Sequence, residues 1–159
     1  MFRRWLCFGL IATTLSCSEP DICCTVVDVG VMIEYVNENG ENLFEIPEGL
    51  TENQIITYIR EDGNWVYYHG GGSAAPRGVK VTDTPEGKVL WLSPSLIADA
   101  AGYSETKLVF SETDADSVRT KIESSGNITV VSEVWYNNEL KWSSVPSERR
   151  FQVVKHGSF

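Results

Sequence analysis

A run of histidine and three glycines, His69 to Gly72, is the first group of residues that could do chemistry. Such runs can present backbone N–H groups to the oxyanion of a tetrahedral intermediate, beside a serine on a Gly-x-Ser-x-Gly turn. The chain contains no Gly-x-Ser-x-Gly motif, and no Gly-Lys-Ser or Gly-Lys-Thr of a phosphate-binding loop follows the glycines. We therefore predict a flexible loop here, no catalytic residue, and a protein that is not an enzyme.

Carboxylates at alternating positions between Glu112 and Ser117 could offer oxygen ligands to calcium. A calcium loop also needs a glycine and a distal bidentate glutamate, which are not placed correctly, so an acidic turn before a strand is favoured. The two histidines, His69 and His156, lie far from the adjacent Cys23 and Cys24, and no zinc-binding spacing results. We expect no metal and no cofactor.

Aromatic residues are the remaining candidates, and three of them flank one predicted hairpin turn: Trp135, Tyr136 and Trp142. Trp135 shares a strand face with Glu133, and Trp142 follows Lys141 across the turn, which suggests that this hairpin exposes indole rings. Exposed rings can stack on sugars or anchor a protein partner. Exposure is the hypothesis for this hairpin, and packing in the core is the favoured fate of each ring taken singly.

The elements that position these residues are short strands, because apolar and polar residues alternate with a period of two along most of the chain. About eight to ten short strands are predicted, and Asn-Gly, Asp-Gly and Asn-Asn pairs supply hairpin turns. They are drawn from eleven short runs: residues 27–35, 43–46, 55–59, 65–68, 79–81, 88–92, 107–110, 118–122, 128–136, 139–143 and 151–155. One short helix is expected after Ser93, with Gly102 beyond its end. With no crossover helices for parallel pairing, we expect an antiparallel β-sandwich.

The first 16 residues have the features of an export signal, with Arg3 and Arg4 before an apolar run of roughly eleven residues. That run is too short to cross a bilayer, which takes about 20 residues. Thr14-Leu15-Ser16-Cys17 resembles the lipobox of bacterial lipoproteins, although Thr14 stands where leucine is usual. The resemblance implies that Cys17 becomes the acylated N-terminus; an ordinary secretory peptide followed by a chance cysteine is the alternative.

The implied division of the chain is a signal peptide at 1–16, an acidic lipid-anchored tether at 17–23 and a β-sandwich domain at 24–159. Ser18-Glu19-Pro20-Asp21 resembles the export signal that sends Bacteroidetes lipoproteins to the cell surface. Several acyl chains hold a protein to a membrane durably. The expected location is therefore the outer membrane, with the cell surface favoured over the periplasmic side.

The charge of the chain excludes some partners. The formal net charge is −9, and because Arg3 and Arg4 leave with the signal, 11 of the 13 basic residues face 22 acidic ones, for −11. Such a surface repels phosphate backbones and anionic lipid heads, so nucleic acid is not expected as a partner. The membrane partner would be lipid tails.

Asn42-Leu43-Phe44 and the later Tyr136-Asn137-Asn138-Glu139-Leu140-Lys141-Trp142 resemble a pattern of small Bacteroidetes lipoproteins. The resemblance implies an immunoglobulin-like β-sandwich and no specific activity. Asp116-Ser117-Val118 likewise resembles the O-glycosylation signal of exported Bacteroidetes proteins, with Ser117 as the acceptor. The expected function is a non-enzymatic surface interaction or assembly module; the alternative is a carbohydrate-binding accessory module that uses the hairpin aromatics.

Overall fold

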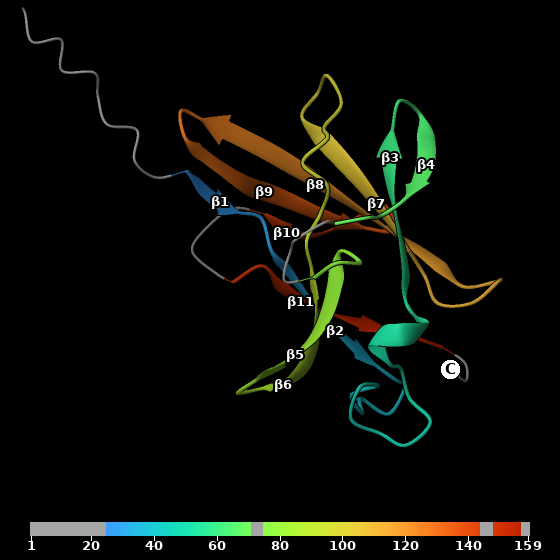
Figure 1. Ribbon diagram of the computed structural model, residues 1–159. Coiled ribbons are helices and arrows are strands. Elements are labelled where there is room, and N and C mark those ends of the chain that lie inside the picture. Colours follow the sequence, from blue (N-terminus) through green and yellow to red (C-terminus); the bar gives the residue numbers. More distant parts are fainter. Residues whose placement is uncertain (1–24, 71–74, 144–147, 157–159) are drawn as a thin grey trace, which may run out of the picture.

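The computed structural model describes residues 25–70, 75–143 and 148–156 and shows a mostly β, sandwich-like protein with two sheets (Figure 1). One sheet has seven strands in the order β1-β9-β8-β7-β3-β4, with β10 also paired to β9. The other has four strands in the order β11-β2-β6-β5. The all-β prediction is confirmed.

The described residues form eleven strands and one short 3-10 helix, η1. Their bounds are β1 (Val26–Asp28), β2 (Val31–Val36), η1 (Glu52–Gln54), β3 (Ile56–Glu61), β4 (Asn64–Tyr67), β5 (Val79–Thr84), β6 (Gly87–Leu92), β7 (Tyr103–Val109), β8 (Ala115–Ser125), β9 (Ile128–Tyr136), β10 (Glu139–Ser143) and β11 (Arg150–Val154). No helix among these residues has the length and apolar character needed to span a membrane.

The expectation of antiparallel sheets is wrong at two places, because both sheets are mixed. β1 pairs with β9 in parallel, and β11 pairs with β2 in parallel. Parallel neighbours need a long connection. Here the strands nearest the two ends of the described chain make these pairs, so most of the chain serves as the connection and no crossover helix is required.

The single strand predicted over 27–35 is divided between the two sheets. β1 joins the seven-stranded sheet and β2 joins the four-stranded one, with Val29 and Gly30 between them. Val27 is exposed, whereas Val29 and the core-facing residues of β2 are buried. A Cβ on Gly30 would lie 2.5 Å from the indole nitrogen of Trp91, so the chain can pass this ring only without a side chain.

Two of the predicted hairpin turns, Asp62-Gly63 and Asn137-Asn138, join paired strands, whereas Asn39-Gly40 is followed only by an isolated bridge between Val36 and Asn42. Asp62 and Gly63 link β3 to β4 with φ values of 48° and 80°, and Asn137 and Asn138 link β9 to β10 with 47° and 67°. Two successive residues with positive φ are the geometry that a tight hairpin favours. These local signals therefore determine the pairing of neighbouring strands.

Two predicted elements are not formed. Residues 43–46 make turns instead of a strand, and Leu43, Phe44 and Leu50 pack their side chains into the core from this loop. Residues 93–102 form no helix. Ser95 Oγ accepts from the backbone N–H of Ile97, and Asp99 Oδ1 accepts from two further backbone N–H groups, so side chains take donors that a helix would need.

The core lies between the sheets and is built on the buried residues of β2. The ring of Tyr35 is fully buried and contacts Phe110 edge-on at 5.3 Å, Phe44 at 6.0 Å and Tyr136 at 6.4 Å. The neighbouring strand β6 contributes Leu90 and Leu92, and the facing sheet contributes Leu108, Val118 and Val134. The side chains on the opposite faces of these strands are left for solvent or for partners.

Candidate functional site

The outer face of the seven-stranded sheet, on the side away from the core, carries a set of aromatic and charged side chains. On β7 the outward residues alternate with Ser104, Thr106 and Leu108, which are buried. We call this set the aromatic–cationic face; it consists of Tyr58, Arg60, Trp65, Tyr67, Tyr103, Glu105, Lys107, Arg119, Lys121, Glu133 and Trp135.

The part of this face on β3, β4 and β7 is held together by cations over rings. Lys107 Nζ lies 4.9 Å from the Tyr58 ring centre and 4.8 Å from that of Trp65, and Arg60 Cζ lies 5.1 Å from the Trp65 ring centre. Tyr58 meets Tyr67 edge-on at 5.9 Å. Each such cation–ring contact stabilises the arrangement by about 0.5–1 kcal/mol at an exposed site. The rings are therefore held in place while remaining accessible.

A second part of the face spans β7, β8 and β9 around Tyr103 and Glu133. Arg119 Cζ stacks 3.8 Å above the Tyr103 ring. Trp135 Nε1 and the Tyr103 hydroxyl donate to Glu133 Oε2 at 3.1 and 3.0 Å, and Lys121 Nζ lies 3.8 Å from Oε1. The hydrogen bond from Trp135, followed by the one from Tyr103 and the nearby cations, lowers the pKa of Glu133.

A shallow depression of about 370 Å³ adjoins the face, between the β3–β4 turn and the loop at 96–99. Arg60, Tyr103 and Ile97 line it, and Ile97 is 51% exposed. Asp99 lines it too, and the backbone N–H of Tyr103 donates to Asp99 Oδ1 at 2.9 Å and lowers the pKa of that carboxyl. Apolar, cationic and anionic groups thus meet in one hollow.

The structure does not bring the three predicted hairpin aromatics to one surface. Trp135 lies half-buried on the aromatic–cationic face, but Tyr136 is only 4% exposed and packs in the core. Neighbouring strand residues point to opposite faces, so Tyr136 was wrongly grouped with Trp135. Trp142 packs against the core because a bulge after Leu140 pairs it with Val134 instead of Glu133.

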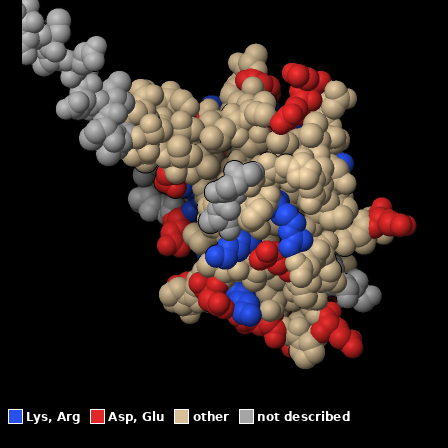
Figure 2. Space-filling model, in the orientation of Figure 1, with Lys and Arg blue, Asp and Glu red and all other residues tan. Residues whose placement is uncertain are grey.

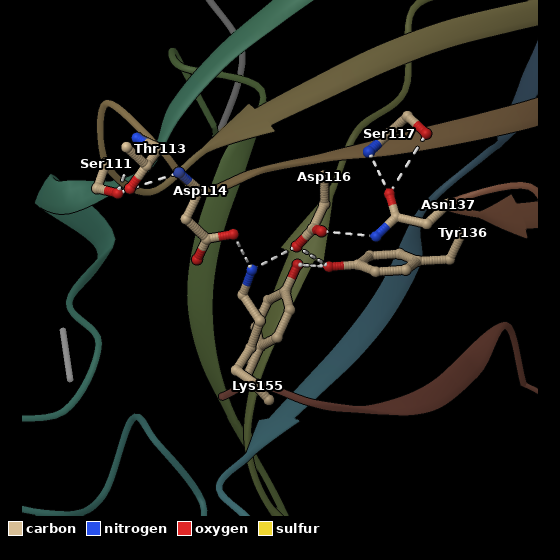
Figure 3. Close-up of polar contacts among 9 residues, drawn as sticks. Ser111, Thr113, Asp114, Asp116, Ser117, Tyr136, Asn137 and Lys155 are labelled. Carbon is tan, nitrogen blue, oxygen red and sulfur yellow. Dashed lines mark hydrogen bonds and ion pairs between the residues drawn. The ribbon is translucent and has the colours of Figure 1, made fainter. Parts of the chain in front are cut away.

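The other predicted positions have different outcomes. Ser117 is half-buried, and its backbone N–H donates to Asn137 Oδ1 at 2.8 Å. His69 is exposed and contacts the Tyr67 ring edge-on, with ring centres 4.6 Å apart. Asp114 in the turn before β8 and Asp116 in β8 both contact Lys155 (Figure 3). Cys17, like the other cysteines and Gly71–Gly72, lies outside the described residues.

Sequence reasoning missed most of the aromatic–cationic face. One signal was visible, since residues 118–122 alternate apolar with polar and leave Arg119 and Lys121 on a wet face. The partners of these cations on β7, β3 and β4 depend on strand order, which periodicity does not reveal. Among the described residues no three His, Cys, Asp or Glu side chains are placed to hold a metal ion.

The fold and this surface define a two-sheet, mostly β protein with mixed strand pairing and an aromatic–cationic outer face. Comparison with protein-family models, with curated proteins and with solved structures found no match for the chain.

Replacing Glu133 by glutamine is expected to flatten the dependence of stability on pH in the acid range. A carboxyl whose pKa is lowered by folding contributes stability that is present above its unfolded value, about 4.3, and is lost as the pH falls through the folded value. Glutamine cannot titrate, so between about pH 5 and pH 3 the melting temperature of the Glu133→Gln variant falls less than that of the wild type.

Thermal unfolding followed by circular dichroism at several pH values measures this effect. Glu139→Gln is the matched control, because it removes a carboxylate that is 71% exposed and pairs only at the surface with Lys141. Parallel pH profiles for the wild type and Glu133→Gln would contradict the assigned role of Glu133.

Proposed function

We propose that the chain is a lipid-anchored protein of the cell envelope that acts as a non-enzymatic surface interaction or assembly module. The support for the anchor is the sequence of residues 1–21, in which a basic start, an apolar run and a small residue precede Cys17. Acyl chains on that thiol would hold the β body at the outer membrane, with the cell surface favoured. An immunoglobulin-like relation of the two sheets is part of the same proposal.

The observation that carries the interaction role is the aromatic–cationic face. Its four cationic side chains stand against Glu105 and Glu133, with Glu123 beside Lys121 as a third carboxylate, on a chain with a net charge of −9. Aromatic and arginine side chains are the residue types enriched at the centres of protein interfaces. The charge of the face complements an acidic partner, and electrostatic steering would speed its association.

The surface drawn in Figure 2 carries charged side chains of both signs. Figure 2 shows Asp and Glu side chains spread around the outline of the molecule in that view, with Lys and Arg side chains gathered nearer its middle. A net negative body with localised cationic areas keeps copies of the chain apart while leaving defined places for an acidic partner.

The alternative is a carbohydrate-binding accessory module. The depression beside the face favours it, because Tyr103 and Ile97 supply apolar contact while Arg60 and Asp99 supply hydrogen-bonding groups. Rings combined with a few oriented polar groups are the usual composition of a sugar site. Trp135 and Trp65 would extend the stacking surface on the same sheet.

Crosslinking on intact cells that express the full chain tests the proposal. The wild type is compared with Cys17→Ala, with Arg60→Glu/Lys107→Glu on the face, and with Lys80→Glu/Lys88→Glu on the four-stranded sheet as a matched charge reversal. We expect a crosslinked protein partner. Its amount should fall about tenfold in Arg60→Glu/Lys107→Glu and stay unchanged in the matched control. The Cys17→Ala protein is expected to be absent from the membrane fraction.

A glycan array with the wild type and with Trp65→Ala, Trp135→Ala and Tyr103→Ala separates the two functions. Selective glycan binding that is lost in these variants, together with no protein partner on cells, would favour the alternative. Equal crosslinking of the face variant and the wild type would contradict the assignment of this face.

A further inference from the structure

The side-chain amine of Lys155 is buried and takes no part in the proposed interaction. It follows β11, and its side chain is only 8% exposed, which is rare for lysine. Nζ lies 2.6 Å from Asp114 Oδ1 and 2.7 Å from Asp116 Oδ2 (Figure 3), and it lies 4.1 Å from the centre of the Phe110 ring. The backbone N–H of Lys155 donates to the carbonyl of Val36 at 2.9 Å and fixes the position of the residue.

Asp116 is enclosed by donors. Asn137 Nδ2 donates to Oδ1 at 2.6 Å, and the Tyr136 hydroxyl donates to Oδ2, the oxygen that also contacts Lys155 (Figure 3). The Asp116 side chain is 9% exposed, while that of Asp114 is 34% exposed and contacts Lys155 from the solvent side. The two carboxylates therefore differ in surroundings although both contact one amine.

We propose that the chain joins Lys155 Nζ to Asp116 Cγ by an intramolecular amide bond, which it forms without a separate enzyme. The N–C bond forms, the bond between Cγ and Oδ2 breaks, and Oδ2 leaves as water. The ammonium and the carboxylate together lose one water molecule and both charges, so atoms and charge balance with no oxidant, reductant or co-reactant.

Each step has a group in place. The ammonium of Lys155 passes one proton to Oδ2, and the resulting amine attacks Cγ while Asp114 accepts a second proton from Nζ. Asn137 Nδ2 stabilises the negative charge that develops on Oδ1, as a donor of an oxyanion hole does. The second proton returns to Oδ2, with Tyr136 donating a hydrogen bond to the departing oxygen.

Tyr136 remains a donor throughout this sequence. Burial, followed by the neighbouring Tyr35 and Asp116, raises the pKa of Tyr136 far above the usual value for a phenol. Its hydroxyl also lies 3.1 Å from that of Tyr35, which holds the ring in place. After the reaction the new carbonyl would accept from Asn137, the new N–H would donate to Asp114, and the Tyr136 hydroxyl would keep its contact with that of Tyr35.

Two physical effects favour the reaction at this place. Holding amine and carboxyl in contact replaces a bimolecular encounter, and effective molarities of about 10⁵ M and above are known for well-oriented groups. Keeping two opposite charges in an apolar enclosure carries a desolvation cost, which the neutral amide does not have. The enclosure by Phe110, Tyr35 and Tyr136 supplies this second effect.

The bond would connect the two sheets covalently. Asp116 belongs to β8 of the seven-stranded sheet, and Lys155 directly follows β11 of the four-stranded sheet. A crosslink that closes a long loop stabilises the folded state by restricting the unfolded chain, by the same reasoning as for a disulfide. When force acts on the domain through a partner or through the lipid anchor, the bond would keep β11 from detaching.

Peptide mapping of the full purified chain under denaturing conditions tests the proposal. Trypsin is expected to leave the bond after Lys155 uncut and to release a branched peptide that joins residues 108–119 to residues 151–159, lighter by one water than the two pieces. Fragmentation should place the link at Asp116. Lys155→Arg is expected to abolish the branched peptide, and Lys141→Arg, a matched change at the surface, to leave it intact.

Asp114→Asn tests the role of Asp114 as proton acceptor, and it changes a partly exposed side chain instead of a buried one. We expect the branched peptide to form at least about a hundredfold more slowly in this variant, the range typical of a lost general base. Quantitative cleavage after Lys155 in the wild type, a link at Asp114, or a water loss confined to one linear peptide would each overturn the proposal.

Discussion

Replacing Asp116 with alanine is expected to lower the free energy of unfolding by at least about 3–5 kcal/mol, the usual cost of removing one partner of a buried ion pair, because the variant loses that pair and cannot form the proposed amide bond. The variant leaves the Lys155 side chain, which is 8% exposed, with only the more exposed Asp114. It also removes the acceptor for Tyr136 and Asn137. A buried donor without an acceptor adds its own desolvation cost.

Equilibrium unfolding in urea measures the loss. Glu139→Ala is the matched control, because Glu139 pairs with Lys141 at 2.8 Å but is 71% exposed, and such surface pairs contribute at most about 1 kcal/mol. Equal losses in the two variants would show that the cluster around Asp116 is no more important than a surface ion pair.

The local parts of the fold could be predicted from the sequence, and the distant pairings could not. Asp62-Gly63 and Asn137-Asn138 specify tight turns through residues that tolerate positive φ, so the hairpins were found. The alternation of residues 27–35 continues unbroken through Gly30, and nothing in it marks the point where the chain changes sheets. The parallel pairs of β1 and β11 likewise depend on contacts across more than a hundred residues.

The candidate surface was predicted only where one strand determines it. The shared face of Trp135 and Glu133 follows from their spacing of two residues, and the structure has it. The prediction for Trp142 was wrong because one extra residue in β10 turns the side chains after it to the opposite face of the sheet. The sequence of this hairpin does not indicate that bulge. Lys155 was correctly expected near the last strand, but its approach to Asp116 depends on the packing of the two sheets.

The loop at 43–50 shows how packing can override a strand pattern. The apolar residues of this segment have a spacing that fits a strand and a turn. The structure instead has an irregular loop, which buries the side chains of Leu43, Phe44 and Leu50 in the core. Leu43 donates its backbone N–H to Tyr35 and accepts from Leu50 at 2.7 Å, so the loop closes on itself. This closure needs the backbone of Gly49 to pass close to Leu43.

Replacing Gly49 with alanine is therefore expected to destabilise the protein by about 3 kcal/mol, at the upper end of the usual cost of overpacking. An added Cβ would lie 2.0 Å from the Leu43 carbonyl oxygen, a backbone atom that cannot rotate away as a side chain could. Relief requires the loop to open, which breaks the hydrogen bond from Leu50 and draws buried leucines from the core.

Thermal and urea unfolding of Gly49→Ala, compared with Gly126→Asn, isolates this steric effect. Gly126 has a φ of 59° and nothing within 4 Å of an added Cβ, and asparagine tolerates that conformation, so the control should change stability by no more than about 0.5 kcal/mol. If Gly49→Ala proved as stable as this control, the close passage of residue 49 over Leu43 would be wrong, and with it the account of how a loop in place of a strand fills this part of the core.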